Sequence, residues 1–134
     1  MSVDRNKELI RRFYEDAWNG GKLGIIDELF ADDYVLRHDL RPTQASPGPA
    51  GMKRITEQFR AAFPDLRFTV ELIVGEGDYV VGRWSATGTH TRRWGDVEAT
   101  GKAASFSGVN IFRFEKGKVA ELWDYRDDLG LEIG

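Results

Sequence analysis

The segment ASFSGVNIFRFEKGKVAELWDYRDD, residues 104–128, predicts a β-hairpin near the end of the chain. One strand is expected at 104–114 and a second at 119–125. Between them lies Glu115-Lys116-Gly117-Lys118, where Gly117 can adopt the positive φ that a tight hairpin turn needs. The second strand ends in a tryptophan followed by several aspartates, and a carboxylate beside aromatic rings suits acid–base chemistry.

The register of this hairpin decides which aspartate faces the interior. If Lys116-Gly117 is a two-residue loop, Asn110 lies opposite Trp123, and Asp127 shares their face. A glycine bulge in the turn would shift the register by one residue and bring Asp124 onto the face of Asn110 instead. We prefer the first register, because it groups the phenylalanines of the hairpin with Trp123.

Composition restricts the function classes. The 134 residues are expected to form one domain, 1–134, with a net charge of −3 and no basic cluster, so a nucleic-acid partner is not expected. The chain has no cysteine, which excludes disulfides, thiolate zinc sites and a cysteine nucleophile. No segment approaches the roughly 18–20 apolar residues of a membrane helix, and the polar N-terminus does not resemble a signal peptide. We therefore expect no membrane association and a cytoplasmic location.

Hydrophobic periodicity predicts helices first and strands afterwards. Apolar residues recur at helical spacing in the first third of the chain, and from residue 65 the period changes to two. A proline-rich loop is expected at 41–51. The predicted helices span 4–18, 23–30 and 50–63, and the predicted strands span 34–38, 66–74, 79–91, 104–114 and 119–125.

This order indicates an α+β domain, with three N-terminal helices on one face of a strongly curved, mostly antiparallel sheet. One face of the strand at 79–91 carries mainly small residues around Trp84 and His90. Small residues leave room that a helix or a ligand can fill. We expect a pocket between this face and the helices.

Motifs spread over nearly the whole chain resemble the SnoaL-like polyketide cyclases, also called ester cyclases, of the nuclear-transport-factor-two-like superfamily. These motifs are Phe13-Tyr14, Trp18-Asn19, Tyr34-Val35 with His38, Phe63-Pro64-Asp65-Leu66, Glu76-Gly77-Asp78, Thr87-Gly88-Thr89-His90, Ile111-Phe112-Arg113-Phe114, Gly117-Lys118, and Trp123 with Arg126-Asp127-Asp128-Leu129-Gly130. The resemblance implies a cone-shaped fold, a cystatin-like α+β barrel around a deep apolar central pocket.

The resemblance also implies an activity. Characterised cyclases of this type close a ring of an aromatic polyketide ester by intramolecular aldol condensation, with no metal, Schiff base or organic cofactor. One pocket aspartate handles the proton. By resemblance, this chain is expected to act in polyketide biosynthesis on an apolar small molecule, without a cofactor, and to form a homodimer or a dimer of dimers through the outer sheet face.

Three residues are candidates for catalysis. The resemblance places the aspartate at Asp127, the fourth residue after Trp123, with Asp124 as the alternative. His38 follows a short strand and is a candidate donor at the pocket rim. Each also has a purely structural interpretation: a solvated aspartate at a strand end, or a surface histidine held by Asp39.

Candidate substrate-binding residues are aromatic or polar side chains expected on the inner faces. Each of the aromatic ones is equally compatible with a role in the core. No His-x-His or His-x-x-x-His spacing occurs, so no metal site is expected. The candidates are His90, Trp84, Asn110, Trp123, Tyr14 and Trp18.

Two other functions remain open at this stage. Relatives on the same scaffold are hydroxylases, so hydroxylation or hydrolysis of a lipophilic compound is one alternative. The other is a non-catalytic module that only binds a small molecule or dimerises, in which side chains would fill the pocket.

Overall fold

The computed structural model describes residues 2–38, 47–93 and 98–127. The elements are α1 (Val3–Arg12), the π-helical segment η1 (Phe13–Asn19), α2 (Gly24–Leu29), β1 (Phe30–His38), α3 (Gly48–Ala62), β2 (Arg67–Glu76), β3 (Tyr79–Thr89), β4 (Ala103–Glu115) and β5 (Lys118–Asp127). The predicted order of helices and strands is confirmed. Residues 41–46 of the predicted proline-rich loop lie outside the described residues, and 48–51 already belong to α3.

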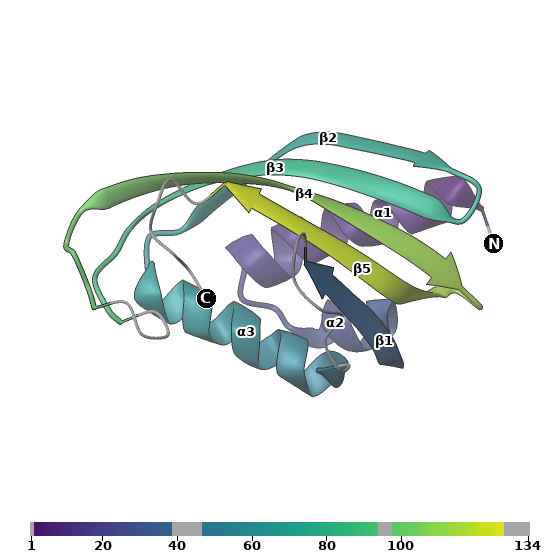
Figure 1. Ribbon diagram of the computed structural model, residues 1–134, viewed down its shortest axis with the longest axis horizontal. Helices are drawn as coiled ribbons and strands as arrows, with labels where there is room; N and C mark the ends of the chain where they lie inside the picture. Colours follow the sequence, from purple (N-terminus) through teal and green to yellow (C-terminus); the bar gives the residue numbers. More distant parts are fainter. Residues whose placement is uncertain (1, 39–46, 94–97, 128–134) are drawn as a thin grey trace.

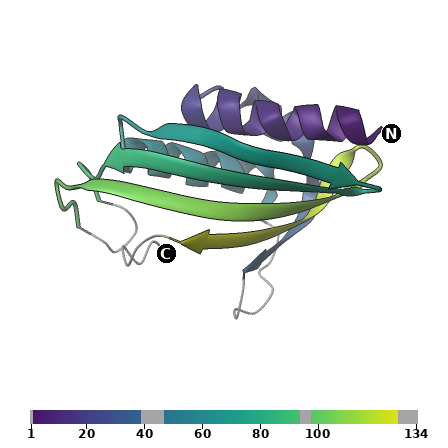
Figure 2. The same cartoon turned by 90° about the horizontal axis from the view of Figure 1, so that it is seen from above.

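The strands form one curved sheet in the order β1-β5-β4-β3-β2. Only the β1–β5 pair of this sheet is parallel, so the predicted mostly antiparallel sheet is confirmed. The helices cover one face of the sheet, and α1 runs along its β2 side (Figures 1 and 2). In the part of the chain that the structure describes, no helix is long and apolar enough to cross a membrane.

Stacked aromatic rings fill much of the layer between the helices and the sheet. The Phe68 ring lies at the centre of this stack, with centroids 5.6 Å from Tyr14, 5.4 Å from Trp18 and 4.6 Å from Trp84. Each such pair contributes roughly 0.5–1.5 kcal/mol beyond the burial of its area. The stack therefore ties the first helical segment to β2 and β3.

The first helix ends differently from the prediction of one regular helix over 4–18. Ser2 caps its start, with its Oγ accepting the Arg5 backbone N–H at 3.1 Å. Its last part is the π-helical η1, whose carbonyls at Trp18 and Asn19 both accept from Arg60 at 2.7 Å. The Asn19 side chain in turn hydrogen-bonds both backbone groups of Phe68, at 2.7 and 2.6 Å, as a neighbouring strand would.

The predicted alternation of β2 is wrong beyond Val70. The pairing with β3 shifts between Val70 and Leu72, which leaves one extra residue on β2. Such a bulge inverts the faces of the residues that follow it. Leu72 and Val74 are therefore 50% and 46% exposed on the outer face, while Ile73 packs against the core.

The hairpin turn is as predicted, but the preferred register of the hairpin is wrong. Lys116 and Gly117 have φ of 52° and 83°, as a two-residue hairpin loop requires, and Glu115 pairs with Lys118. The register then shifts because Phe114 pairs with Val119 while Arg113 pairs with Glu121. The extra residue, Ala120, lies within β5 and not in the turn.

This bulge changes which residues of β5 face the helices. Asn110 pairs with Asp124 instead of Trp123, and Asp127 pairs with Ser107. Because side chains alternate along a strand, Asp124 shares the inner face with Asn110, and Trp123 and Asp127 point to the outer face. The predicted grouping of Trp123 with the hairpin phenylalanines is therefore wrong. Its ring contacts the outer-face residues Tyr79, at 6.4 Å, and Arg37, at 5.8 Å.

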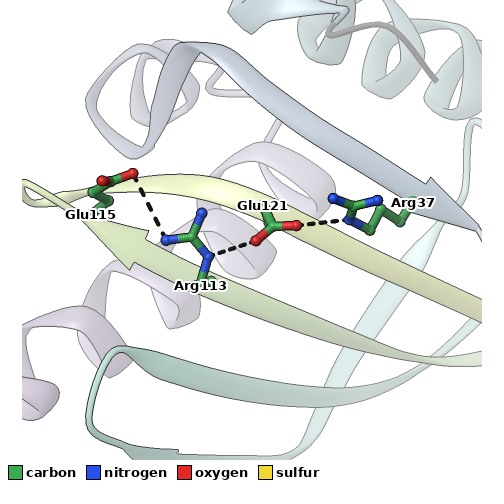
Figure 3. Close-up of polar contacts among 4 residues, drawn as sticks. All are labelled: Arg37, Arg113, Glu115 and Glu121. Atoms are coloured by element: carbon green, nitrogen blue, oxygen red, sulfur yellow. Dashed lines mark hydrogen bonds and ion pairs between the residues drawn. The ribbon is translucent and has the colours of Figure 1, made fainter. Parts of the chain in front are cut away.

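The outer face also carries a row of alternating charges (Figure 3). The Glu121 carboxylate accepts from Arg113 Nε at 2.6 Å and from Arg37 Nε at 2.7 Å, and Arg113 lies 3.8 Å from Glu115. Apolar side chains beside the row are exposed, among them Tyr79 at 46% and Tyr125 at 38%. The homodimer expected through this face stays a prediction.

Replacing Glu121 with glutamine should remove a pH-dependent contribution to stability. Desolvation pushes the pKa of Glu121 up, but the hydrogen bonds from Arg113 and Arg37 outweigh it and hold the pKa below its ordinary 4.5. A lowered carboxyl pKa stabilises the fold above that ordinary value, and this contribution is lost as pH falls through the folded value. Urea denaturation at pH 7 should show Glu121→Gln less stable by about 1 kcal/mol.

The difference between the wild type and Glu121→Gln should shrink at pH 3, and a difference that stays constant with pH would contradict this account. Glu115→Gln is the matched control. Its longer ion pair and its side chain, which is 60% exposed, predict little change at either pH.

Candidate functional site

A hydrogen-bonded cluster of polar side chains lies on the inner face of the sheet. Its centre is Asn110 on β4, which is 8% exposed. Asn110 Oδ1 accepts from the Tyr14 hydroxyl and from Trp84 Nε1, both at 2.9 Å. Its Nδ2 donates to Asp124 Oδ1, also at 2.9 Å. With Arg126, described below, these residues are called the Asn110 cluster.

The amide orientation of Asn110 follows from its neighbours. The indole N–H of Trp84 can only donate, so the atom of Asn110 that faces it must be the oxygen. The amide nitrogen then faces Asp124, whose carboxylate oxygen accepts. The observed arrangement therefore satisfies all three of its partners at once.

Two glycines make room for the cluster. Gly82 on β3 pairs with Asn110, and a Cβ placed there would overlap the Tyr14 hydroxyl. Gly108 on β4 pairs with Trp84, and a Cβ there would overlap the indole. The small residues predicted to leave space on β3 thus admit a helical side chain, Tyr14.

Asp124 is the charged member nearest Asn110. Its side chain is 17% exposed, and its Oδ2 lies 3.2 Å from Arg126 Nε. The bulge in β5 places both residues of this ion pair on the inner face, opposite Asn110 and Gly108. Burial, and then the negative charge of Asp124, raise the pKa of the Tyr14 phenol well above its ordinary 10.0. Tyr14 therefore remains a neutral donor at physiological pH.

Asp127 does not face the interior, so that prediction is wrong. Its side chain is exposed at the end of β5, three residues beyond Asp124 and on the opposite face. His38 ends β1, and its backbone lies in register beside Asp124 in the parallel pair. The His38 side chain lies outside the described part of the chain, so its role stays a prediction.

His90 lies apart from the Asn110 cluster. It follows β3, eight residues after Gly82, which corresponds to about 26 Å of strand. It is fully buried, and its ring stacks on Phe63 with centroids 5.0 Å apart. Neither ring nitrogen has a hydrogen-bond partner among the described residues. Its role in binding stays a prediction.

The other candidates divide between core and surface. Trp18 packs against Phe59 and Phe68 in the aromatic stack, and Trp123 lies on the outer face. Tyr34, named above only within a family motif, is fully buried with a hydroxyl that lacks a partner within the described ranges. The sequence signal for this burial was the spacing of Tyr34 and Leu36, because residues two apart in a strand lie on the same face. Burial raises the pKa of Tyr34.

Two further features do not involve the cluster. A surface hollow of about 340 Å³ is lined by Asn19 and residues 66–69, so it contains none of the Asn110 cluster. Across the described ranges, no group of three or more His, Cys, Asp or Glu side chains is placed to hold a metal ion.

Comparison with known proteins identifies the family. Residues 8–133 match the family model described as SnoaL-like polyketide cyclase. The chain belongs to this family. A comparison with curated protein sequences finds no match.

Several solved structures resemble the chain over almost its whole length. AclR from Streptomyces galilaeus, a candidate hydroxylase, is 32% identical with a TM-score of 0.80, covering 95% of this chain and 81% of AclR. IdmH from Streptomyces antibioticus, a candidate polyketide cyclase, is 29% identical with a TM-score of 0.76, covering 95% of each chain. A SnoaL-like protein from Jannaschia sp. CCS1 is 21% identical with a TM-score of 0.83, covering 96% and 90%, and supports the fold alone.

Substituting Gly82 should disturb the Asn110 cluster from the sheet side. Gly82→Ala places a methyl group where the Tyr14 hydroxyl lies, so the free energy of unfolding should fall by about 1–3 kcal/mol. Gly24→Ala is the control, because nothing lies within 4 Å of a Cβ at the start of α2 and alanine favours helix. Denaturant midpoints at unchanged slope measure both. Equal midpoints for the two variants would show that Gly82 is not needed for close packing.

Two buried tyrosines should respond in opposite ways to loss of the hydroxyl. Tyr14→Phe removes a donor from Asn110 and should cost about 1–2 kcal/mol in the free energy of unfolding at pH 7. Tyr34→Phe removes a buried hydroxyl without a partner in the described structure, so stability should be unchanged or higher. Urea denaturation compares the two variants, and a larger loss for Tyr34→Phe would contradict the hydrogen bonding described above.

The same variants test the effect of alkaline pH. A raised tyrosine pKa contributes stability below the ordinary value of 10.0, and this contribution is lost as pH rises toward the folded value. Wild-type stability should therefore fall from pH 9 to pH 11. The fall should be smaller in each Phe variant, which lacks one of the two phenols.

Proposed function

We propose that this SnoaL-like protein is a cofactor-free acid–base enzyme that closes a ring in an apolar, carbonyl-rich small molecule by an intramolecular aldol-type step. The observation that carries the proposal is the pairing of Asn110 with Asp124 on the inner face of the sheet. A carboxylate that can accept a proton and an amide that can donate a hydrogen bond lie side by side in a largely aromatic layer. Family membership supports the same reaction class.

The proposed reaction conserves every atom of the substrate. The Asp124 carboxylate accepts a proton from the carbon next to a carbonyl group, which leaves an enolate. The enolate carbon attacks a second carbonyl of the same molecule and forms the new C–C bond. Asp124 then returns the proton to the resulting alkoxide. Proton transfer by a positioned group contributes roughly 10²–10⁴-fold to the rate, and holding both reacting ends together adds to it.

Three residues around Asp124 have supporting roles in this proposal. The hydrogen of Asn110 Nδ2 that is not directed at Asp124 donates to the enolate oxygen, where negative charge develops. Arg126 holds the second carboxylate oxygen and so fixes its direction. His38, whose backbone lies in register beside Asp124, is the candidate hydrogen-bond donor at the rim of the expected pocket. Asp124 thus takes the role that the family resemblance carried to Asp127, because it is the aspartate on the inner face.

Hydroxylation is the second candidate function. It is favoured by the 32% identity to AclR, which is described as a candidate hydroxylase. The two functions differ in their need for an oxidant: hydroxylation incorporates oxygen from O₂, whereas cyclisation proceeds under argon. Incubation under ¹⁸O₂ with mass analysis of the product separates them.

The role of Asp124 can be tested without the natural substrate. Wild-type protein in D₂O should accelerate deuterium exchange at the α-carbon of an aromatic β-keto ester above the protein-free rate, followed by proton NMR. Asp124→Asn should lose roughly 10²–10⁴-fold of this acceleration, because its amide cannot accept the proton. Asp127→Asn, the matched control on the opposite face, should stay within about twofold of the wild type. Loss of exchange in Asp127→Asn alone would return the catalytic role to Asp127.

A further inference from the structure

The hydrogen-bonding capacity of Asn110 is almost fully used. An asparagine amide has two acceptor sites on its oxygen and two hydrogens on its nitrogen. Tyr14 and Trp84 both donate to the oxygen, and one hydrogen goes to Asp124. Within the described residues, the second hydrogen has no recorded acceptor, so it is the part of this amide that remains for a ligand.

The two donors belong to the most buried part of the cluster. Tyr14 is 1% exposed and Trp84 is 6% exposed, and they come from η1 and β3, on two sides of Asn110. If the amide turned over, its NH₂ group would face the Trp84 indole, which can only donate, and its oxygen would face the Asp124 carboxylate, which can only accept. Both of these hydrogen bonds would be lost in a buried place, where unmade hydrogen bonds are most costly.

The backbone is shaped to permit this arrangement. Gly82 and Gly108 are the strand partners of Asn110 and Trp84, and a Cβ at either would overlap one of the two donor side chains. The π-helical turn brings Tyr14 to the space above Gly82, and π-helical turns are frequent at functional sites. Sheet and helix therefore both contribute to holding the two donors on one oxygen.

We infer that Tyr14 and Trp84 are positioning residues that together fix the Asn110 amide, so that one of its hydrogens holds Asp124 and the other is presented to the substrate. The inference rests on the proposed function. It differs from the expectation above, in which both aromatic residues were candidates for direct contact with the substrate. Neither touches the reacting atoms, and both act through Asn110.

The fixed amide also restricts the substrate class. It leaves one acceptor, the Asp124 carboxylate, beside one donor, the amide N–H. This pair complements an enolisable carbonyl compound, which supplies an acidic C–H and an acceptor oxygen next to each other.

A double-mutant cycle tests the inference, because both side chains donate to the same oxygen of Asn110. Trp84→Phe and Tyr14→Phe should each lower kcat for exchange of the β-keto ester by about 2–10-fold. The double variant should lose at least about fivefold more than the product of the two single losses, with KM changed by less than about threefold. Tyr34→Phe is the matched control, a buried tyrosine outside the cluster, and should retain wild-type kcat.

Three outcomes would overturn the inference: a double loss equal to the product of the singles, a loss confined to KM, or an equal loss in Tyr34→Phe. Failure of the proposed function is distinguished by Asp124→Asn. If that variant is inactive while the double variant keeps wild-type kcat, only the inference is wrong. If Asp124→Asn exchanges at the wild-type rate, the proposed function fails and the inference fails with it.

NMR of the wild-type protein keeps the test decisive if the double variant does not fold. The Trp84 indole proton should exchange slowly and show scalar coupling across the hydrogen bond to the side-chain carbonyl carbon of Asn110. The side-chain amide nitrogen of Asn110 should couple in the same way to the Asp124 carboxyl carbon, through the one hydrogen that faces Asp124. A rapidly exchanging indole proton would show that the amide is not held as inferred.

Discussion

The single extra residue in β5 is the constraint on which the rest of the inner face depends. Because Ala120 has no partner on β4, every later residue of β5 has the opposite orientation from that of a continuous ladder. Asp124 therefore meets Asn110, and Trp123 moves to the outer face beside Arg37. Without this bulge the carboxylate and the amide would lie on different faces, and the acid–base pair would not exist.

The same bulge separates two polar systems with different surroundings. On the outer face, Glu121 lies between two guanidinium groups in a row of alternating charges. On the inner face, Asp124 has an amide on one side and a guanidinium on the other, among aromatic rings. Outer charges stabilise the sheet while remaining near water. The charges on the inner face lie among aromatic rings, where a weakly polar substrate would exclude water. Each hydrogen bond there therefore has a larger interaction energy than on the outer face.

Aromatic packing and polar chemistry support each other in the helix–sheet layer. Tyr14 and Trp84 both stack on Phe68 through their rings, and both donate to Asn110 through their polar atoms. Packing fixes where each ring lies, and the rings then fix the direction of the amide. A mutation in the stack is therefore expected to act on the site as well as on stability.

The sequence by itself determined the order of elements and the hairpin turn, because helical and alternating periods and the positive φ at Lys116-Gly117 are local properties. The family motifs likewise gave the α+β fold. Only the tertiary structure decided that Asp124 and not Asp127 faces inward, and that Tyr14 fills the space above Gly82. The reason is physical: a bulge in a strand depends on how distant segments pack, and a one-residue shift inverts a face without changing any local pattern.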